Sequence, residues 1–407
     1  MISNKKIYMF SNGCPENKND AQRIIDFFQQ NNWILTKNYT EADIIILNIC
    51  GQQLWSPLFK QYISLEKMIK KVKKKKKTSG KIIICGCITK INKNLTSRFA
   101  DFIIEPDNFE KFNEIIHANI KIETVNANQT FNQKNNFFTM YILLLKEFYE
   151  DPLTIISKNY ISLKLLINKN IEKDHYSKLK RYHIKISTGC ISNCSYCSIK
   201  FSRGNLKSKP IENIVQEFEE GVASGYNEFL LIGTDLGCYG RDIGKTLVDL
   251  LNRLVEIEGN FTIMLRNVNP QFLIEMLPDL IEIFKTGIIS YIGSSVQSGN
   301  NQILNLMNRK YSAEEYKNAI NTIKKVNPKI QIRSQFIVGF PGETASEFED
   351  TIRLIREIEL DFIKIYDFKP EASTRASKMK KQVPDYIIKK RHRELYKQFY
   401  TAKYLNK

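Results

Sequence analysis

Three cysteines, Cys190, Cys194 and Cys197, follow one another with C-x3-C-x2-C spacing. Thiolates packed this closely on one loop suit an iron–sulfur cluster, which cysteines usually hold through four ligands. Because this loop supplies three ligands, one iron of a [4Fe–4S] cluster stays open to a small molecule. A zinc site would want a fourth Cys or His, and His183, the nearest one, lies inside a strand-like run. A disulfide framework is typical of secreted proteins, and nothing in the sequence indicates secretion.

A second set of three cysteines, Cys14, Cys50 and Cys87, is spread over the first quarter of the chain. Each cysteine comes shortly after an apolar run with the character of a buried strand. Because the carboxyl ends of parallel strands line one crevice, we expect the three thiols to converge there and to hold a second cluster. The alternative is that they are buried structural cysteines. Cys85 is expected to face the core, which leaves Cys87, after Gly86, as the ligand.

Helical stretches separate the strand-like runs of this first part. Such alternation predicts a doubly wound parallel sheet of the α/β class. A lysine-rich run before the third strand is expected at the edge opposite the cysteines. The predicted strands are Lys6–Ser11, Ala42–Asn48 and Lys81–Ile84, the helices are Asp20–Gln30 and Lys60–Lys75, and the basic run is Lys73–Lys77.

The second half repeats the strand–helix unit and predicts a parallel barrel or partial barrel with six strands. The loop of Cys190 follows the first of these strands, and further glycine-rich and polar segments follow the others. Catalytic groups gather at that face of such barrels, so these loops are expected to enclose one site. The predicted strands are His183–Ser187, Glu228–Ile232, Thr262–Arg266, Ile289–Ile292, Gln331–Val338 and Asp361–Phe368.

The predicted organisation is a cluster domain at 1–125, a linker or insertion at 126–178, a barrel at 179–385 and a basic helical tail at 386–407. The linker begins as a polar stretch, expected to be exposed, and continues with two apolar stretches, Phe138–Phe148 and Leu153–Leu166. The tail is expected either to close the barrel, which we favour, or to contact nucleic acid.

The formal net charge is +18, and 43% of the residues are hydrophobic. This charge suits an acidic partner such as nucleic acid, although a compositional preference for Lys would produce the same excess. No apolar run reaches membrane-spanning length and no signal peptide is evident. We therefore expect a cytoplasmic protein with no membrane partner.

Several motifs resemble those of the radical S-adenosylmethionine (SAM) methylthiotransferases, which share the signature cysteine loop of radical SAM enzymes. The resemblance covers about residues 6–385, apart from the middle segment, and is closest to the branch that modifies a ribosomal-protein aspartate. The family usually ends in a small β-barrel, which is not expected here. The matching segments are Gly13-Cys14-Pro15-x-Asn17-x-x-Asp20, Asn48-Ile-Cys50, Gly86-Cys87, Arg203-Gly204-x-x-x-Ser208-Lys209-Pro210, Asp235…Tyr239-Gly240-x-Asp242, Asn308-Arg309-x-Tyr311 and Arg333-x-x-Phe336-Ile-Val-Gly-Phe-Pro-Gly-Glu-Thr344.

The resemblance implies a partial (βα)6 barrel, two [4Fe–4S] clusters, SAM, and a reductant such as flavodoxin or ferredoxin. The first-domain cysteines would carry the sulfur that is methylated, and SAM at the Cys190 loop would yield a 5′-deoxyadenosyl radical that removes hydrogen from an unactivated carbon. Departures from the family at Gly293, Ser295 and Ser373 are expected to face the substrate. The SAM contacts implied are Tyr196, Gly233, Asp235, Gln297, Arg333 and Gly339.

The implied activity is transfer of a methylthio group to a macromolecule. The first-cysteine motif favours a peptide or protein side chain as acceptor, whereas Gln297-Ser298-Gly299 and the net charge resemble the branch that modifies tRNA adenosine. Two other classes stay open at this point. One is a radical SAM enzyme with a different outcome, such as sulfur insertion without methylation or epimerisation, and the other is a non-catalytic iron–sulfur protein.

Overall fold

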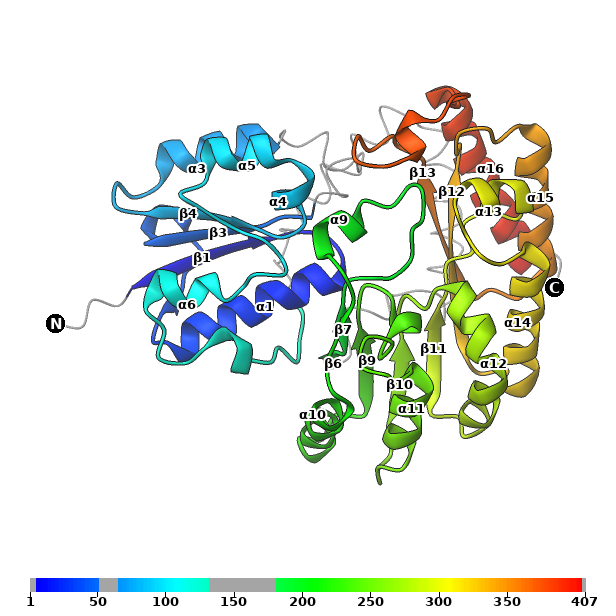
Figure 1. Cartoon of the computed structure of the whole chain (residues 1–407), viewed down its shortest axis with the longest axis horizontal. Coiled ribbons are helices and arrows are strands. Elements are labelled where there is room, and N and C mark those ends of the chain that lie inside the picture. Colours follow the sequence, from blue (N-terminus) through cyan, green and yellow to red (C-terminus); the bar gives the residue numbers. More distant parts are fainter. Residues whose placement is uncertain (1–4, 51–64, 132–180, 405–407) are drawn as a thin grey trace.

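The computed structural model describes residues 5–50, 65–131 and 181–404 of the 407-residue chain. These residues form two α/β units that lie side by side, each built on a parallel sheet (Figure 1). The α/β class and the two successive parallel sheets are therefore as predicted. The two apolar stretches predicted within 132–180 lie outside the described residues.

The first unit is a five-stranded sheet in the order β2-β1-β3-β4-β5, with every pairing parallel. β-branched runs such as Ile44-Ile-Ile-Leu are buried throughout, as expected for strands covered on both faces. The two short outer strands were not predicted. The strands are β1 (Lys6–Ser11), β2 (Ile34–Leu35), β3 (Ile44–Asn48), β4 (Lys81–Cys85) and β5 (Phe102–Ile104).

Helices cover both faces of this sheet (Figure 1). Helix α1 begins with Pro15, which suits the first helical position, and buries Phe27 and Phe28 against the sheet. At the opposite end of the sheet Lys77 pairs with Asp43 at 2.6 Å, just before β3. The basic run therefore lies at the edge away from the cysteines, as predicted. The helices are α1 (Pro15–Gln30), α3 (Leu65–Lys75), α4 (Ile88–Ile91), α5 (Lys93–Phe99) and α6 (Lys111–Ile116), with 3₁₀ turns at Tyr39–Glu41 and Ile122–Thr124.

The second unit is a six-stranded parallel sheet in the order β13-β12-β11-β10-β9-β6. Each strand pairs with the next one along the chain, and β6 and β13 form open edges, so the sheet is a partial barrel. All six predicted strands are present. They are β6 (Tyr182–Lys185), β9 (Glu228–Ile232), β10 (Thr262–Leu265), β11 (Ile289–Gly293), β12 (Gln331–Val338) and β13 (Phe362–Asp367).

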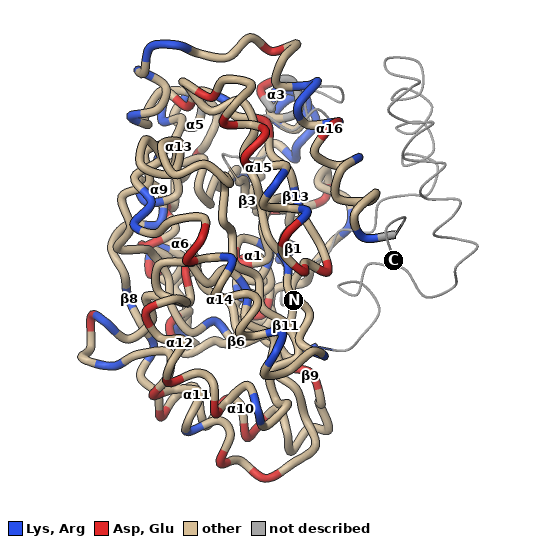
Figure 2. Tube along the Cα trace, turned by 90° about the vertical axis from the view of Figure 1, so that its right-hand side faces the viewer, with Lys and Arg blue, Asp and Glu red and all other residues tan. Residues whose placement is uncertain are grey.

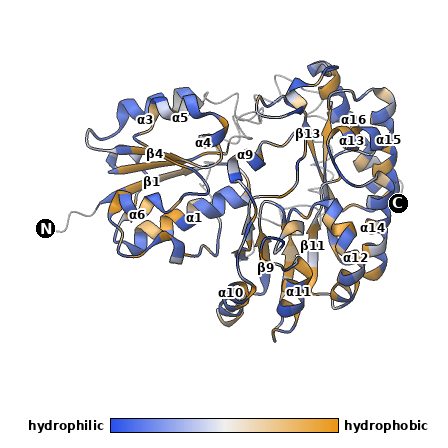
Figure 3. Cartoon of the chain, in the orientation of Figure 1, coloured by the Kyte–Doolittle hydropathy of each residue, from blue (hydrophilic) through white to orange (hydrophobic). Residues whose placement is uncertain are grey.

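Helices follow these strands and pack their apolar faces on the sheet (Figure 3). Three of them begin with a capping box, in which a Ser or Thr and an acidic residue three positions later satisfy each other's backbone N–H groups. The helices are α9 (Ile199–Arg203), α10 (Ile211–Ala223), α11 (Leu247–Val255), α12 (Pro270–Lys285), α13 (Asn301–Leu306), α14 (Ala313–Val326) and α15 (Ala345–Glu357), with 3₁₀ turns at Leu236–Cys238 and Ala376–Lys378 and a small antiparallel pair, β7 (Ser187–Thr188) with β8 (Lys207–Ser208).

The basic tail forms helix α16 (Asp385–Tyr404), which contacts α15 and β13. Ile388, Leu395 and Phe399 are buried in the barrel core, and Arg391 pairs with Glu343 at 2.8 Å. The tail therefore closes the outer side of the barrel, which is the favoured alternative. Lysines and arginines occur along the whole described chain, interspersed with acidic residues (Figure 2).

The start of the predicted linker is not an exposed loop. Ala127 is buried, and its carbonyl accepts a hydrogen bond from Asn19 of α1 at 2.7 Å. The next residue, Asn128, accepts one from the backbone N–H of His183 in β6 at 2.9 Å. This stretch therefore joins the two units through hydrogen bonds to its backbone carbonyls. Among the described helices, none is both long enough and apolar enough to cross a membrane.

Candidate active site

The cysteines of the first unit lie just beyond the carboxyl ends of three adjacent strands, β1, β3 and β4. Cys14 and Cys50 are close together, because a Cβ built on Gly13 would lie 3.2 Å from the Cys50 sulfur. Loss of water around the thiol, together with the neighbouring Cys50, raises the pKa of Cys14 to about 12, although the residue keeps exposed surface. The structure thus brings Cys14 and Cys50 together, and Cys87 is near enough to contribute to the raised pKa of Cys14.

A buried amide network holds these cysteine loops. The side chain of Asn17 donates to the Asn12 carbonyl at 2.8 Å, and Asn48 donates to the Asn17 carbonyl at 2.6 Å. The Asn12 side chain in turn accepts from the backbone N–H of Cys50 at 2.8 Å. Gly86 has φ +87°, and a Cβ there would lie 2.5 Å from the Asn48 side chain, so this turn requires glycine. The motif around Cys14 and the motif around Cys50 are therefore joined in one hydrogen-bonded network.

Cys85 and Cys87 separate as predicted. Cys85 is fully buried in the core that includes Ile7 and Met9, and burial strongly raises the pKa of its thiol. Cys87 stands at the start of helix α4, at the edge of the sheet shared with Cys14. A thiol within the apolar core is inert, so Cys85 is a poor ligand candidate, and Cys87 stays the predicted ligand.

The loop of Cys190, Cys194 and Cys197 runs between β7 and α9. The segment after α13 holds it: Ser195 donates through its backbone N–H to Met307 at 3.0 Å and through its hydroxyl to Leu306 at 2.7 Å. From the other side, Ala376 donates to the Ser195 carbonyl at 2.9 Å. Rigid support of this kind keeps closely spaced ligands in place for a cluster.

A buried arginine lies beside this loop. Arg309 donates to the sulfur of Cys194 at 3.3 Å, to the Tyr311 hydroxyl at 2.8 Å and to the Ser295 carbonyl at 2.9 Å. The sequence marked Arg309 only as part of a motif and indicated no role for it. Its closeness to a thiol depends on a fold contact between residues more than a hundred positions apart, which no local pattern signals.

A pocket of about 330 Å³ opens against the same loop. Two cysteines of the triad, Cys194 and Cys197, line it together with basic, polar and aromatic side chains. Its wall includes Thr374, next to the departure from the family at Ser373. The other lining residues are Ser192, Asn193, Ser195, Lys200, Phe201, Asn308 and Arg375.

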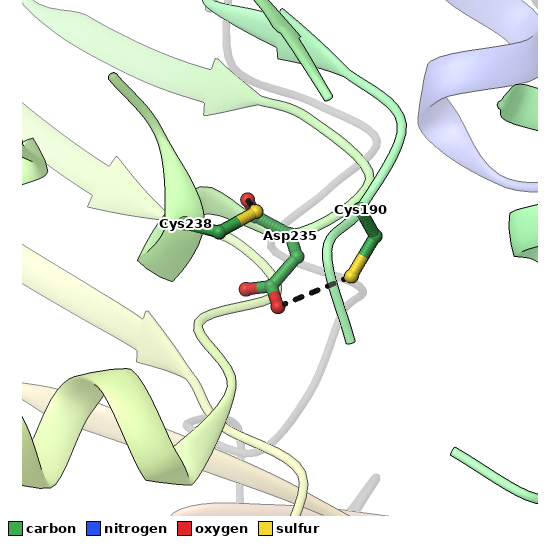
Figure 4. Close-up of side chains that lie close together, drawn as sticks. All are labelled: Cys190, Asp235 and Cys238. Carbon is green, nitrogen blue, oxygen red and sulfur yellow. Dashed lines mark hydrogen bonds between the residues drawn. The ribbon is translucent and has the colours of Figure 1, made fainter. Parts of the chain in front are cut away.

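Cys190, Asp235 and Cys238 form a compact group in which the three ligand atoms lie within 4.8 Å of one another (Figure 4). Cys190 lies 3.6 Å from one Asp235 oxygen, and the other oxygen accepts from the backbone N–H groups of Gly237 and Asn269. Burial raises the pKa of the Asp235 carboxyl. Asp235 therefore touches the predicted cluster loop, and Cys238 lies next to both.

Neither predicted cysteine triad has its sulfurs within 4.8 Å of one another in the described residues. A single zinc ion, with Zn–S distances of about 2.3 Å, would hold its sulfurs roughly 4 Å apart. Neither triad therefore has the close sulfur spacing that a single zinc ion requires. His183 lies within β6 and belongs to no group of three ligand atoms among the described residues.

The predicted SAM contacts fall mostly at the carboxyl ends of barrel strands. Gln297, after β11, has φ +75°, and its buried side-chain oxygen has no hydrogen-bond partner among the described residues. Such an orphaned acceptor fits a ligand contact. Tyr196 lies in the cysteine loop itself, with its ring 6.5 Å from that of Phe340. Gly233 follows β9, where a Cβ would lie 2.7 Å from the Ser187 hydroxyl.

Arg333 lies inside the predicted strand, as the third residue of β12, level with Gly293 at the end of β11. Gly339 has φ +76°, and its missing Cβ would lie 2.3 Å from a side-chain carbon of Ile388. The packing of Ile388, in α16, against this turn thus requires glycine at position 339.

The two cysteine sites are neighbours. Helix α4, which starts after Cys87, contacts helix α9, which starts two residues after Cys197. Figure 1 shows α9 between the two units. The arrangement therefore places two potential cluster sites on either side of one junction.

Each of the two units matches a known sequence family. The Radical SAM superfamily model matches residues 184–355, and the model of Uncharacterized protein family UPF0004 matches residues 6–104. Among solved structures, the radical S-adenosylmethionine methyltransferase TsrM from Kitasatospora setae covers 92% of this chain and 75% of its own, with a TM-score of 0.61 and 9% identity. This likeness concerns the fold.

Three relatives are similar over most of this chain. The tRNA-2-methylthio-N(6)-dimethylallyladenosine synthase of Pelagibacter ubique is 31% identical over 89% of this chain and 75% of its own. The probable threonylcarbamoyladenosine tRNA methylthiotransferase of Methanocaldococcus jannaschii is 29% identical, with coverages of 100% and 85%. The ribosomal protein uS12 methylthiotransferase RimO of Bdellovibrio bacteriovorus is 29% identical, with coverages of 96% and 80%. The chain thus belongs to the radical SAM methylthiotransferases, transferases that use SAM and two [4Fe–4S] clusters.

Proposed function

We propose that this enzyme transfers a methylthio group to an adenosine of tRNA. The observation that carries the proposal is the pocket beside Cys194 and Cys197. At its rim Phe201 is 56% exposed, an unusual position for a large aromatic side chain. Exposed aromatic rings stack on unpaired bases, and this is how proteins hold single-stranded RNA.

Two cations line the same pocket as the aromatic ring. Lys200 and Arg375 both line the pocket and both donate to Asn193, at 2.6 and 2.9 Å. Cations beside a stacking residue suit the phosphates of an RNA loop or a carboxylate carried by the base. The net charge of +18 also favours binding of RNA.

The names of the relatives support the same acceptor class. Two of the three relatives described above are named for tRNA adenosine derivatives, and the threonylcarbamoyl group of one carries a carboxylate. A protein side chain, which the first-cysteine motif favours, remains the second candidate because RimO, named for a ribosomal protein, is 29% identical over 96% of this chain.

In this proposal Cys14, Cys50 and Cys87 hold one cluster, and Cys190, Cys194 and Cys197 hold the other. The bound clusters and SAM supply the radical chemistry and the methylthio group, while the protein positions them and excludes water. The SAM contacts proposed are Tyr196, Gly233, Asp235, Gln297, Arg333 and Gly339. A reductant such as flavodoxin or ferredoxin delivers electrons, and the cytoplasm, where tRNA is modified, is the proposed compartment.

The test uses cluster-reconstituted enzyme, SAM and a reductant, with three acceptors in parallel. These are tRNA anticodon stem–loops carrying dimethylallyladenosine, the same carrying threonylcarbamoyladenosine, and a peptide containing the uS12 loop. Mass spectrometry should find the methylthio gain on one of the RNAs. A gain on the peptide alone would reject the tRNA proposal and select the second candidate.

The pocket assignment has its own variant. Phe201→Ala should lower kcat/KM for the RNA by about tenfold, since stacking on an aromatic ring contributes about 1–3 kcal/mol per base. Tyr386, which is 73% exposed on α16, provides the matched control in Tyr386→Ala. Equal effects of the two substitutions would contradict a role for the pocket.

A further inference from the structure

The first turn of α1 connects the two cysteine sites. Glu16, two residues after Cys14, is only 5% exposed, and it accepts hydrogen bonds from the hydroxyls of Thr188 and Thr234 at 3.0 and 3.1 Å. Thr188 stands two residues before Cys190, and Thr234 directly precedes Asp235. The Glu16 carboxylate therefore connects the loop of Cys14 to the two segments that carry Cys190 and Asp235.

One turn later, Asp20 makes a second connection. It pairs with Arg203 at 2.5 Å and with Lys185 at 2.6 Å, and both Asp20 and Arg203 are almost completely buried. Burial alone would raise the pKa of Asp20, but Lys185 and Arg203 hold it at about 2, so the carboxylate stays ionised. Arg203 is the last residue of α9, the helix that follows Cys197.

Arg203 also reaches the amide network of the first unit. Its second terminal nitrogen donates to the Asn17 side chain at 3.4 Å, and Asn17 in turn contacts Asn12 and Asn48. A continuous polar path thus runs from the loops of Cys14 and Cys50 to the helix after Cys197. The planar fork of arginine can make these bonds together, whereas lysine offers a single point charge.

Buried charges are tolerated only where their partners are correctly placed, because each ion has lost its water. Two anions from the first unit, Glu16 and Asp20, and two cations from the barrel, Lys185 and Arg203, satisfy one another across the junction. A small rotation or slide of one unit would leave an uncompensated charge. The network therefore favours one relative placement of the two units.

We propose that Glu16, Asp20 and Arg203 are positioning residues that fix the distance and orientation between the two cluster sites. The proposal rests on the cluster ligands given under the proposed function. Transfer requires the sulfur held at Cys14, Cys50 and Cys87 to reach the substrate carbon activated beside the Cys190 loop. The network sets how closely the sulfur can approach the substrate carbon. SAM binding and cluster assembly do not depend on the network.

The central variants are Glu16→Gln and Arg203→Lys, which keep size or charge but remove part of the network. Asp361→Asn is the matched control, because it weakens an ion pair with Lys324, at 2.8 Å, that lies wholly within the barrel. For each variant we would measure iron content, 5′-deoxyadenosine formed and methylthio product formed. Glu16→Gln should keep about eight irons per chain and form 5′-deoxyadenosine, while its product per 5′-deoxyadenosine falls about tenfold or more.

A second readout does not depend on turnover. Hydrogen–deuterium exchange of the wild-type and variant chains should be faster in α4 and α9 for Glu16→Gln and Arg203→Lys but unchanged there for Asp361→Asn. In the reduced, cluster-loaded proteins, the magnetic interaction between the two clusters, seen by electron paramagnetic resonance, should weaken in the same two variants. Both measurements remain informative if the acceptor is not tRNA.

The outcomes separate the possibilities. Loss of product per 5′-deoxyadenosine together with faster exchange at α4 and α9 supports positioning. Unchanged exchange and cluster interaction, with an unchanged product ratio, overturns it. A proportional loss of iron, 5′-deoxyadenosine and product also overturns it, since this pattern indicates a general loss of stability. A wild-type enzyme that forms no product on any acceptor rejects the proposed function, while exchange and magnetic interaction still decide the placement of the units.

Discussion

Arg309 donates a hydrogen bond to the sulfur of Cys194 at 3.3 Å, and the arginine is only 7% exposed. A cation this close to a proposed cluster ligand, in a site with little water, favours the more negative, reduced state of the cluster. Nearby charge and hydrogen bonds to sulfur are recognised determinants of cluster potential. Arg309 thus links the barrel segment after α13 to the redox chemistry of the Cys190 loop.

We predict that Arg309→Met lowers the reduction potential of this cluster. A unit charge about 5 Å away contributes about 3 kcal/mol at an effective dielectric constant of about 20, so the shift should be on the order of 100 mV. A redox titration followed by electron paramagnetic resonance measures it. Arg253→Met, which removes a half-exposed arginine from α11, should leave the potential unchanged. An unchanged potential in Arg309→Met contradicts the assigned role.

The two sets of cysteines make separate predictions for iron content. Alanine substitution of Cys50 or of Cys194 should each reduce the iron from about eight to about four per chain. Cys85→Ala should keep about eight irons, because Cys85 lies in the apolar core. Cys238→Ala should also keep about eight irons, because Cys238 belongs to neither triad. Iron analysis with the absorbance of the reconstituted proteins checks all four, and a halved content in Cys85→Ala would reject the chosen ligand set.

Strand positions could be predicted where a run of apolar residues was long enough to indicate a buried strand. Runs such as Ile44-Ile-Ile-Leu are apolar at every position, which predicts a strand buried on both faces. The strand of Cys85 ends before Gly86, so Cys87 lies beyond the strand end. Strands β2 and β5 were missed because two or three residues carry too little periodicity to be recognised. The Cys190 triad was predicted from its spacing and the Cys14 triad from position at strand ends, where the structure places those cysteines.

The junction could not be predicted in the same way. Glu16, Asp20 and Arg203 are charged residues whose burial is created by the other unit. Charged residues are usually exposed to solvent, and only the docked fold reverses that expectation. The resemblance marked Asp20 and Arg203 as motif residues without indicating that they pair. Gly339 is a similar case, since its partner Ile388 lies in a helix beyond the barrel strands.

Gly339→Ala should destabilise the protein through two separable effects. Its φ of +76° is unfavourable for a side chain, and the new Cβ would lie 2.3 Å from Ile388. Gly225 has nearly the same φ, +77°, and a Cβ added there would meet no atom within 4 Å, so Gly225→Ala reports strain alone. We expect a loss of about 1–2 kcal/mol for Gly225→Ala from left-handed strain, and about 1–3 kcal/mol more for Gly339→Ala from overpacking.

Urea unfolding of both variants measures this difference in the free energy of unfolding. Adding Ile388→Ala to Gly339→Ala should remove the overpacking part, although the lost apolar contacts of Ile388 carry their own cost. A double-mutant cycle isolates the coupling between the two residues. Additive effects would show that the glycine does not serve the packing of α16.

His183 should make the stability depend on pH. Burial in β6, with further contributions from Arg181 and Arg266, lowers the pKa of its imidazole from 6.5 to about 4. Between these values the unfolded chain binds the proton and the folded chain does not, so stability falls as the pH decreases from about 6.5 to 4. The full effect is up to about 3 kcal/mol, since each pKa unit corresponds to about 1.4 kcal/mol.

The matched variants are His183→Gln and His117→Gln. His117 is exposed after α6, and its substitution controls for the loss of a histidine as such. His183→Gln should lose less stability than His117→Gln when the pH is lowered from about 7 to about 5, as measured by urea midpoints in the same cluster-loaded state. Comparing the variants cancels the acid lability of the clusters, which both share. If stability falls equally with pH in the two variants, the pKa of His183 is not lowered in the folded protein.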